Sequence, residues 1–247
     1  MPVIVEEPRI KIIGLVNETE AMKHLERIGR TCYKSEDKIT EESHAKFLRG
    51  IIERGHEAMI EHVSVTIQFY TDRGVTHEMV RHRLASFAQS STRYCNYSQD
   101  KFGNAIHVIK PFYFDPEEPT KEVTLWDDTT AQMNSFDVWF NAMQVANWAY
   151  RNLTQVFGRQ PQEARTVLPQ STASDIYVTA NLREWRHIFR LRALGDTGTP
   201  HPDMRSIMLK ALYYMTAFYP IVFKDIFNKC VEKGLYDNGL LYGNRPR

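Results

Sequence analysis

The segment from Arg81 to Tyr94, RHRLASFAQSSTRY, constrains the fold more than any other part of the chain. It begins with Arg81, His82 and Arg83, ends near Arg93, and carries small polar residues in between. Placing these cations close together costs free energy unless an anion lies among them. Guanidinium groups bind phosphate oxygens in pairs, and consecutive backbone N–H groups of a loop form an anion-binding concavity. The segment therefore predicts a fold that holds one or more phosphates here.

The overall charge narrows the kind of ligand. The 247 residues include 31 Lys and Arg and 30 Asp and Glu, so the formal net charge is +1. Proteins that follow a nucleic-acid backbone carry a broad basic excess, whereas the positive charge here is local. A small anionic ligand is therefore favoured over a nucleic-acid partner. No apolar run approaches the roughly 18 residues of a membrane span, so no membrane partner is expected either.

The cysteines and the N-terminal residues indicate the compartment. Cys32, Cys95 and Cys230 show no CxxC spacing, which argues against a disulfide framework or a cysteine metal site. The N-terminal residues MPVIVEEPRIKII lack the basic start and apolar run of a signal peptide. A cytoplasmic protein is expected.

Hydrophobic periodicity predicts an α/β or α+β fold. Alternation over residues 63–70 indicates a half-buried strand, and a second strand is expected over 9–16, where Gly14 weakens it. Helical spacing is found over residues 18–30, 41–54, 135–157, 181–194 and 203–219. The proline-containing residues 111–134 are expected to form mostly a surface connection. No linker rich in Gly or Ser interrupts residues 1–247, which are expected to form a single domain.

A short helix from His77 to Leu84, capped by Thr76, is expected to carry the arginines. Consecutive residues on a helix point about 100° apart, so Arg81 and its two neighbours would reach different parts of a large ligand or different subunits. The alternative is a solvated basic helix end, where cations favour the C-terminal dipole. The loop Ser90 to Arg93 favours the ligand because it adds hydroxyls, free N–H groups and a guanidinium.

Two weaker patterns have simpler explanations. Glu61 and His62 suggest a metal pair, but the chain has no HExxH motif and no third ligand at metal spacing, so a zinc site is rejected and no metal is expected. For a histidine such as His62, a hydrogen bond in or near the core is a commoner role than metal binding. Arg165 precedes Val-Leu-Pro, and its simplest role is a surface ion pair.

The segment from Asn181 to Arg192 combines cations with a helical period. These two residues are eleven positions apart, which places them within about 20° of one helix face. A second stripe holds Arg183, His187 and Arg190. Asn181 and Glu184 also match a capping box, so a purely structural role for Asn181 is the alternative. The chain has no GxGxxG and no P-loop, which excludes those two ways of holding a nucleotide.

Together these patterns resemble the flavin-dependent thymidylate synthases (ThyX). The signature of that family is RHR, seven residues and then Ser, here Arg81 to Ser91. The similarity extends to GHxxxxEH from Gly55 to His62, to Arg165-x-Val-Leu-Pro and to the helix over 181–192, and it covers about residues 9–220. The resemblance implies an α/β domain with a twisted central sheet flanked by helices.

The resemblance also implies a reaction. Members of this family make dTMP by reductive methylation of dUMP at C5. Methylenetetrahydrofolate supplies the carbon, reduced FAD supplies the hydride, and NADPH usually reduces the flavin. Four copies assemble into a homotetramer whose active sites are shared between subunits.

Site residues follow from the resemblance by position. The implied flavin residues are His56, Arg81, His82, Arg83, Gln89, Asn181 and His187. The implied dUMP residues are Glu78, Gln89, Ser90, Ser91, Thr92, Arg93, Arg165 and Arg192. Glu78 stands where some relatives have glutamine, and His187 where they have asparagine. Ser90 falls at a variable position, so a backbone role is expected there.

The residue types agree with this chemistry. C5 of uracil becomes nucleophilic only when negative charge builds on the ring, and Arg192 is expected to stabilise that charge. Arg93 and Arg165 would hold the 5′-phosphate through charge-assisted hydrogen bonds. Ser91 has been proposed as a nucleophile in this family; a positioning role is expected instead, because a serine without a base is weak. Cys95 is expected only to pack.

Two rival functions remain open. The first is an RNA-binding module that uses the same arginines with Phe87 and Tyr94. The near-neutral net charge and the lack of a stacking platform argue against it. The second, nearer rival is a different flavin-dependent reaction on a nucleotide.

Overall fold

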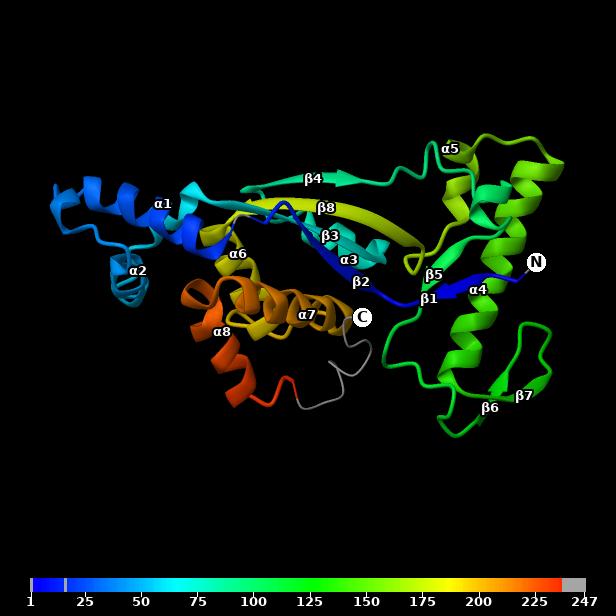
Figure 1. Cartoon of the computed structure of the whole chain (residues 1–247). Coiled ribbons are helices and arrows are strands. Elements are labelled where there is room, and N and C mark those ends of the chain that lie inside the picture. The colour runs from blue at the N-terminus through cyan, green and yellow to red at the C-terminus, as the bar shows by residue number, and fades with distance from the viewer. Residues whose placement is uncertain (1, 16, 237–247) are drawn as a thin grey trace. The chain divides into compact units, whose positions relative to one another are not determined.

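The computed structural model describes residues 2–15 and 17–236, and it confirms a mixed α/β fold (Figure 1). The chain forms two compact units, each assembled from three separate stretches. Unit 1 comprises the stretch up to Pro8, Tyr70–His77 and Gln89–Ile176; unit 2 comprises Arg9–Phe69, Glu78–Ala88 and the stretch from Tyr177. Each unit therefore depends on residues distant in the sequence.

A four-stranded sheet has the order β2-β3-β8-β4. Its strands are β2 (Arg9–Ile13), β3 (Ser64–Asp72), β8 (Ala173–Asn181) and β4 (Ala85–Gln89). The predicted alternation is confirmed in β3, where Val65, Ile67 and Phe69 are buried. The N–H of Leu182 donates to the carbonyl of Val63 at 2.9 Å, and the Thr66 and Thr179 hydroxyls are 2.8 Å apart. From the first contact to the second, the residue number rises along β3 and falls along β8, so these two strands are antiparallel.

Helices of unit 2 bury an aromatic core. They are α1 (Glu18–Thr31), α2 (Ser43–Glu53), α6 (Leu182–Phe189), α7 (Pro202–Phe218) and α8 (Pro220–Glu232). Ring centroids lie 6.3 Å apart between Phe69 and Trp185, 5.5 Å between Trp185 and Phe189, and 5.6 Å between Phe189 and Phe223. The Trp185 indole N–H donates to the carbonyl of Val65 at 3.0 Å, which fixes α6 against β3. Helix α8 was not predicted from the sequence.

Unit 1 is organised around one long helix, α4 (Ser135–Arg151), drawn in green in Figure 1. Its other elements are β1 (Ile4–Glu6) paired in parallel with β5 (His107–Ile109), the antiparallel pair β6 (Lys121–Thr124) and β7 (Thr130–Met133), and α5 (Pro161–Ala164). Asn134 and Asp137 form a capping box, with side chain to backbone distances of 2.9 and 3.0 Å. This box explains why the helix begins where the periodicity predicted.

The predicted helix over 135–157 is found as α4 and a π-helical turn that continues it to Val156. Residues Asn152–Val156 form a π-helical turn, and Phe157 is 70% exposed. Trp139, Met143 and Tyr150 are the buried apolar residues of α4. A π turn adds a residue to the helical repeat and rotates the residues after it away from the core.

Three local predictions were wrong in whole or in part. Helix α3 spans Arg73–Met79, so Thr76 lies inside it and donates its hydroxyl to the Arg73 carbonyl at 3.0 Å instead of capping a later helix. Residues 111–134 are mostly exposed, as predicted for a surface connection, but they also form the antiparallel pair β6 and β7, which was not predicted. The first sheet strand, β2, ends at Ile13 because Gly14 adopts a φ of 64°, a left-handed conformation that breaks a strand.

The structure also bears on the predictions about disulfides and membrane-spanning helices. All three cysteines are free thiols. Among the described residues, none of the helices has both the length and the apolar character needed to cross a bilayer.

Candidate active site

Unit 2 contains a cavity of about 860 Å³ whose wall is rich in arginine. The 3₁₀ segment Glu57–His62, the turn after α3, helix α6 and the π-helical turn Arg190–Leu194 supply its wall. The lining residues are Glu57, Glu61, Arg81, His82, Arg83, Leu84, Asn181, Arg183, Glu184, His187, Arg190, Leu191 and Arg192. The structure thus brings together six predicted site residues: Arg81, His82, Arg83, Asn181, His187 and Arg192.

The three consecutive cationic residues lie in a turn and not on a helix. The N–H of Arg81 donates to the Glu78 carbonyl at 3.2 Å, and that of His82 donates to the Met79 carbonyl at 3.1 Å. Arg81 and Arg83 are exposed, whereas His82 is only 6% exposed. The predicted solvated helix end therefore describes the arginines but not the histidine. Within the described chain, Arg81 and Arg83 have no ion pair or side-chain hydrogen bond, so both guanidinium groups are available to an anion.

Two side chains distant in the sequence hold Arg192 in place. Its Nε donates to Nε2 of His82 at 3.1 Å, and its Nη1 donates to Oε2 of Glu78 at 3.0 Å. Since Nε2 of His82 accepts this bond, the imidazole is neutral and carries its proton on Nδ1. Burial and, to a smaller extent, the charges of Arg192 and His187 together lower the pKa of His82 to about 4. This arrangement leaves Nη2 of Arg192 for a ligand.

The predicted cap of α6 is confirmed. Oδ1 of Asn181 accepts a hydrogen bond from the N–H of Glu184 at 2.8 Å. The expected shared face of Asn181 and Arg192 does not follow from a regular helix, because α6 ends at Phe189 and Arg192 lies in the π-helical turn. Both residues nevertheless line the cavity, since the turn widens the helix on that side.

The second predicted stripe also lines the cavity, with its cations partly neutralised. Arg183 forms an ion pair with Glu61, and Nε of Arg190 lies 2.9 Å from Oδ2 of Asp196. The ion pair with Arg183 gives Glu61 an ordinary structural partner. The His187 ring stands edge-on to that of His82, with centroids 6.3 Å apart. Among the three stripe residues, only His187 was predicted as a site residue.

Two acidic lining residues were missed from the sequence. Glu184 is 6% exposed, and burial raises the pKa of its carboxyl, while His187 and Arg183 oppose that shift. Glu57 accepts a hydrogen bond at 2.9 Å from Nε of Arg186, a buried arginine that also forms two hydrogen bonds with Asp225 at 2.7 and 2.8 Å. Glu57 stands inside the GHxxxxEH motif and Glu184 was considered only as a cap, so neither drew attention as a cavity residue.

Ligand atoms of His82, Glu184 and His187 lie within 4.8 Å of one another, a spacing at which three side chains can share a metal ion. However, Nε2 of His82 already accepts the Arg192 hydrogen bond. The guanidinium groups around the cavity would also repel a cation. The arrangement therefore favours an anionic ligand, and the absence of a metal stays a prediction.

A second group of predicted residues lies in unit 1 and begins with Gln89. Its Nε2 donates to Oγ1 of Thr76 at 2.9 Å and to Oγ of Ser174 at 3.0 Å. The Ser90 hydroxyl lies 3.0 Å from that of Ser174 and accepts the N–H of Asp175 at 3.2 Å. Because both Gln89 amide hydrogens are used inside the protein, its carbonyl oxygen is the group presented to a ligand.

Ser91 organises the loop after Ser90. Its Oγ accepts the N–H of Arg93 at 3.3 Å, and its carbonyl accepts the N–H groups of Tyr94 and Cys95 at 3.1 and 3.0 Å. In the part of the chain that is described, no histidine or carboxylate hydrogen-bonds to the Ser91 hydroxyl. Thr92, the next residue of the loop, is buried, with 6% exposure. These contacts favour the positioning role over the nucleophilic one.

Arg93 and Arg165 are both exposed cations of unit 1. The guanidinium of Arg93 lies 5.5 Å from the centre of the Tyr94 ring, and Arg165 follows the C-terminal end of α5. Neither forms an ion pair with any described residue, so the surface ion pair considered for Arg165 is not found. His56, in contrast, lies outside the lining of the cavity in unit 2, where its Nδ1 is 3.3 Å from the Tyr33 hydroxyl.

A mixed α/β fold with unpaired arginines along a large cavity is typical of proteins with a site for an anionic ligand. The chain belongs to the family described as thymidylate synthase complementing protein (Thy1), whose model matches residues 14–221. The family predicted from the sequence is thereby confirmed.

Individual relatives agree with this assignment. The chain is 31% identical over 231 residues to a flavin-dependent thymidylate synthase of Corynebacterium diphtheriae, covering 91% of this chain and 85% of the relative. It is 33% identical over 206 residues to the enzyme of the same name from Corynebacterium efficiens, covering 81% and 78%. The crystal structure of the UMP/dUMP methylase PolB from Streptomyces cacaoi, bound with 5-Br UMP, has a TM-score of 0.68 at 18% identity and covers 93% of this chain and 98% of PolB. This last comparison supports the fold.

Proposed function

We propose that this protein is a flavin-dependent thymidylate synthase, which converts dUMP to dTMP with methylenetetrahydrofolate as the carbon donor. The observation that carries the proposal is the cavity of unit 2, where the two unpaired guanidinium groups of Arg81 and Arg83 border about 860 Å³. Membership of the Thy1 family and the shared name of the relatives support the same activity. Reduced FAD supplies the hydride when it is bound, and NADPH is proposed as the reductant of the flavin.

The residues of the cavity fit FAD. A pocket of this size lies within the range of about 300–1,000 Å³ that small-molecule and cofactor sites occupy. Arg81 and Arg83 would bind the diphosphate, since guanidinium forks match phosphate oxygens two at a time. The neutral His82, the amide of Asn181 and the imidazole of His187 would face the less charged part of the cofactor. His56 is proposed for the same cofactor by family resemblance alone.

The unit 1 residues fit the nucleotide. Arg93 and Arg165 would hold the 5′-phosphate, because both are cations without an ion pair in the described chain. Ser91 would hold the loop in shape through its backbone and hydroxyl contacts, and Thr92, which is buried beside it, is proposed for the same site. The carbonyl oxygen of Gln89 would accept a hydrogen bond from a donor group of the bound ligands. Ser90 contributes through the Ser174 hydroxyl and the Asp175 backbone.

Arg192 is the residue proposed to assist the chemistry. Its orientation is fixed before a ligand arrives, because His82 and Glu78 each accept one of its N–H groups. A preorganised guanidinium stabilises negative charge that develops on the pyrimidine without the cost of reorienting solvent. Glu78 would also contribute to dUMP binding. We propose that four copies assemble into a homotetramer in which each active site draws residues from more than one copy.

The decisive experiment measures flavin oxidation. The flavin of the purified protein is reduced without oxygen, and its absorbance is then followed after adding dUMP, methylenetetrahydrofolate or both, with product dTMP determined by chromatography. Reoxidation with formation of dTMP is expected only when both are present. UMP serves as the matched control for another flavin-dependent nucleotide reaction.

Other outcomes would favour the rivals. Reoxidation with UMP but not dUMP would point to a different methylation. A colourless protein that FAD cannot reconstitute, but that binds RNA in a salt-dependent manner, would support the binding module.

A further inference from the structure

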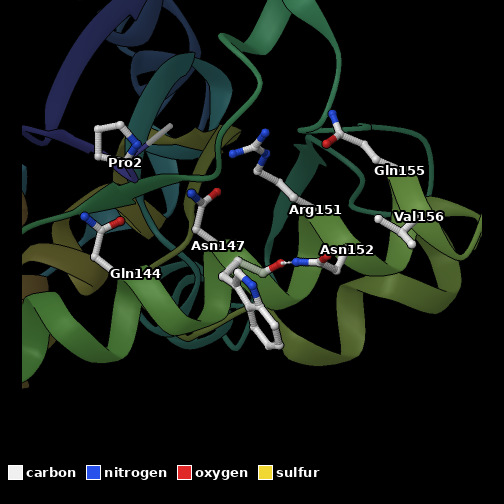
Figure 2. A pocket seen from close by; sticks show the side chains of 8 residues that line it. Pro2, Gln144, Asn147, Arg151, Asn152, Gln155 and Val156 are labelled. Atoms are coloured by element: carbon white, nitrogen blue, oxygen red, sulfur yellow. Dashed lines mark hydrogen bonds between the residues drawn. The ribbon is translucent and has the colours of Figure 1, made fainter.

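Unit 1 contains a cavity of its own, with a volume of about 500 Å³. Helix α4 and the π-helical turn that continues it line this cavity, together with Pro2. Figure 2 shows Asn147, Arg151 and Gln155 following one another along the helix, with Pro2 across from them. None of the lining residues was predicted for the flavin or the nucleotide, so the proposed reaction leaves this cavity unexplained.

Arg151 lies at the centre of the lining and lacks partners. Its Nε is buried and has no hydrogen-bond partner, and no described residue forms an ion pair with its guanidinium. The lining contains no aspartate or glutamate that could neutralise it. Buried polar groups in folded proteins nearly always have a partner, so an unpaired donor inside a cavity indicates a bound group that completes it. For a guanidinium, that group is an anion.

The remaining lining groups suit a planar ring. The Trp148 side chain is 67% exposed, which leaves a face of the indole open for stacking. Asn152 donates from Nδ2 to the Trp148 carbonyl at 2.8 Å, and Gln155 donates from Nε2 to the Ser98 carbonyl at 3.3 Å. Their amide oxygens are thereby left as acceptors. Gln144 accepts the Val3 N–H at 2.8 Å through Oε1, which leaves its amide nitrogen as a donor.

The backbone at this cavity also departs from a regular α-helix. The described chain has two π-helical turns, Asn152–Val156 and Arg190–Leu194. The second lines the arginine-rich cavity of unit 2 through Arg190 and Arg192, and the first lines this cavity through Asn152 and Gln155. Single π turns within α-helices occur frequently at functional sites, because they displace side chains from the regular repeat.

We propose that this cavity of unit 1 is a second ligand site, which binds a planar heteroaromatic ring carrying an anionic group, the chemistry of a nucleoside monophosphate. Arg151 binds the anion, Trp148 stacks on the ring, and the carboxamides of Gln144, Asn152 and Gln155 contact the ring edge. The volume of about 500 Å³ suits such a ligand.

The test uses the full-length holoprotein labelled with 5-fluorotryptophan, whose resonances are assigned with W148F and W126F. Trp126 is 89% exposed and serves as the internal control. AMP and UMP are titrated as purine and pyrimidine probes, with adenosine and inorganic phosphate as partial ligands. A shift of the Trp148 signal with AMP or UMP, but not of the Trp126 signal, is expected. Adenosine and phosphate should each bind at least about tenfold more weakly.

Arg151→Gln should weaken binding by at least about tenfold, since the charge-assisted bonds are lost. Arg159→Gln is the matched control, because Arg159 is an exposed arginine just beyond the cavity lining. Both variants should keep dTMP formation and the far-ultraviolet circular dichroism of the parent. The proposal is overturned if neither nucleotide shifts Trp148, if adenosine binds as well as AMP, or if the Arg151 variant binds normally. If Arg151→Gln does not fold, calorimetry compares the binding of AMP and of inorganic phosphate to Trp148→Ala. Loss of the preference for AMP supports the site, and an unchanged preference overturns the proposal.

Discussion

Replacing His82 with glutamine tests how the cavity of unit 2 fixes Arg192. In the folded protein, Nε2 of His82 accepts a hydrogen bond from Nε of Arg192 at 3.1 Å. A glutamine carbonyl can accept the same bond but does not titrate. The substitution therefore removes the proton equilibrium of this site while keeping an acceptor for Arg192.

The magnitude follows from the pKa of His82, which burial lowers from 6.5 to about 4, with smaller contributions from Arg192 and His187. Below the pKa that His82 has in the unfolded chain, the unfolded chain binds a proton that the folded protein does not bind. The free energy of unfolding therefore falls as the pH drops from about 6.5 toward about 4. About 1.5 pH units of this range lie above about pH 5, and each unit corresponds to about 1.36 kcal/mol. The expected loss in the free energy of unfolding between about pH 7 and about pH 5 is therefore about 2 kcal/mol.

The assay is urea unfolding at both pH values and at one protein concentration, because the proposed assembly would make stability depend on concentration. The parent protein should lose about 2 kcal/mol more than His82→Gln on acidification. Contributions of the other residues are common to both proteins and cancel in the difference. His201→Gln is a matched control at an exposed histidine and should behave like the parent. Equal pH dependence of the parent and His82→Gln would show that His82 is not held neutral, and the account of Arg192 would be refuted.

Three further substitutions test separate parts of the proposal. Arg192→Lys should lower the rate of dTMP formation about 10- to 100-fold, with flavin content unchanged, because one ammonium cannot replace the oriented guanidinium; parallel loss of flavin would assign Arg192 a different role. Ser91→Ala should leave measurable dTMP formation, and complete loss with dUMP binding intact would favour the nucleophile. Arg186→Met should cost about 3–5 kcal/mol in urea unfolding, because Arg186 is 4% exposed and its loss leaves the Glu57 carboxylate without its partner; a near-neutral result would mean that Glu57 is hydrated instead.

Local patterns were read correctly where one period governs a whole element. The alternation over residues 63–70 corresponds to β3, and the spacing over 203–219 corresponds to α7. The cap at Asn181 was also recognised, because a cap needs only residues three positions apart. Predictions failed where the backbone departs from one period: α3 ends before Arg81, and two helices end in π turns. An added residue in a turn leaves no mark on the hydrophobic spacing.

The sequence alone determined the chemical types at the site: guanidinium groups, imidazoles and hydroxyls concentrated in two short segments, with a family signature around them. Only the tertiary structure decided which of them meet. Arg192 contacts His82 and Glu78, which are 110 and 114 positions away, and Arg186 contacts Glu57 at a separation of 129. Such pairs depend on how β3, α6 and the turn after α3 pack together. Periodicity reports which face of an element is buried, but the partner of a buried polar group is set by the whole fold.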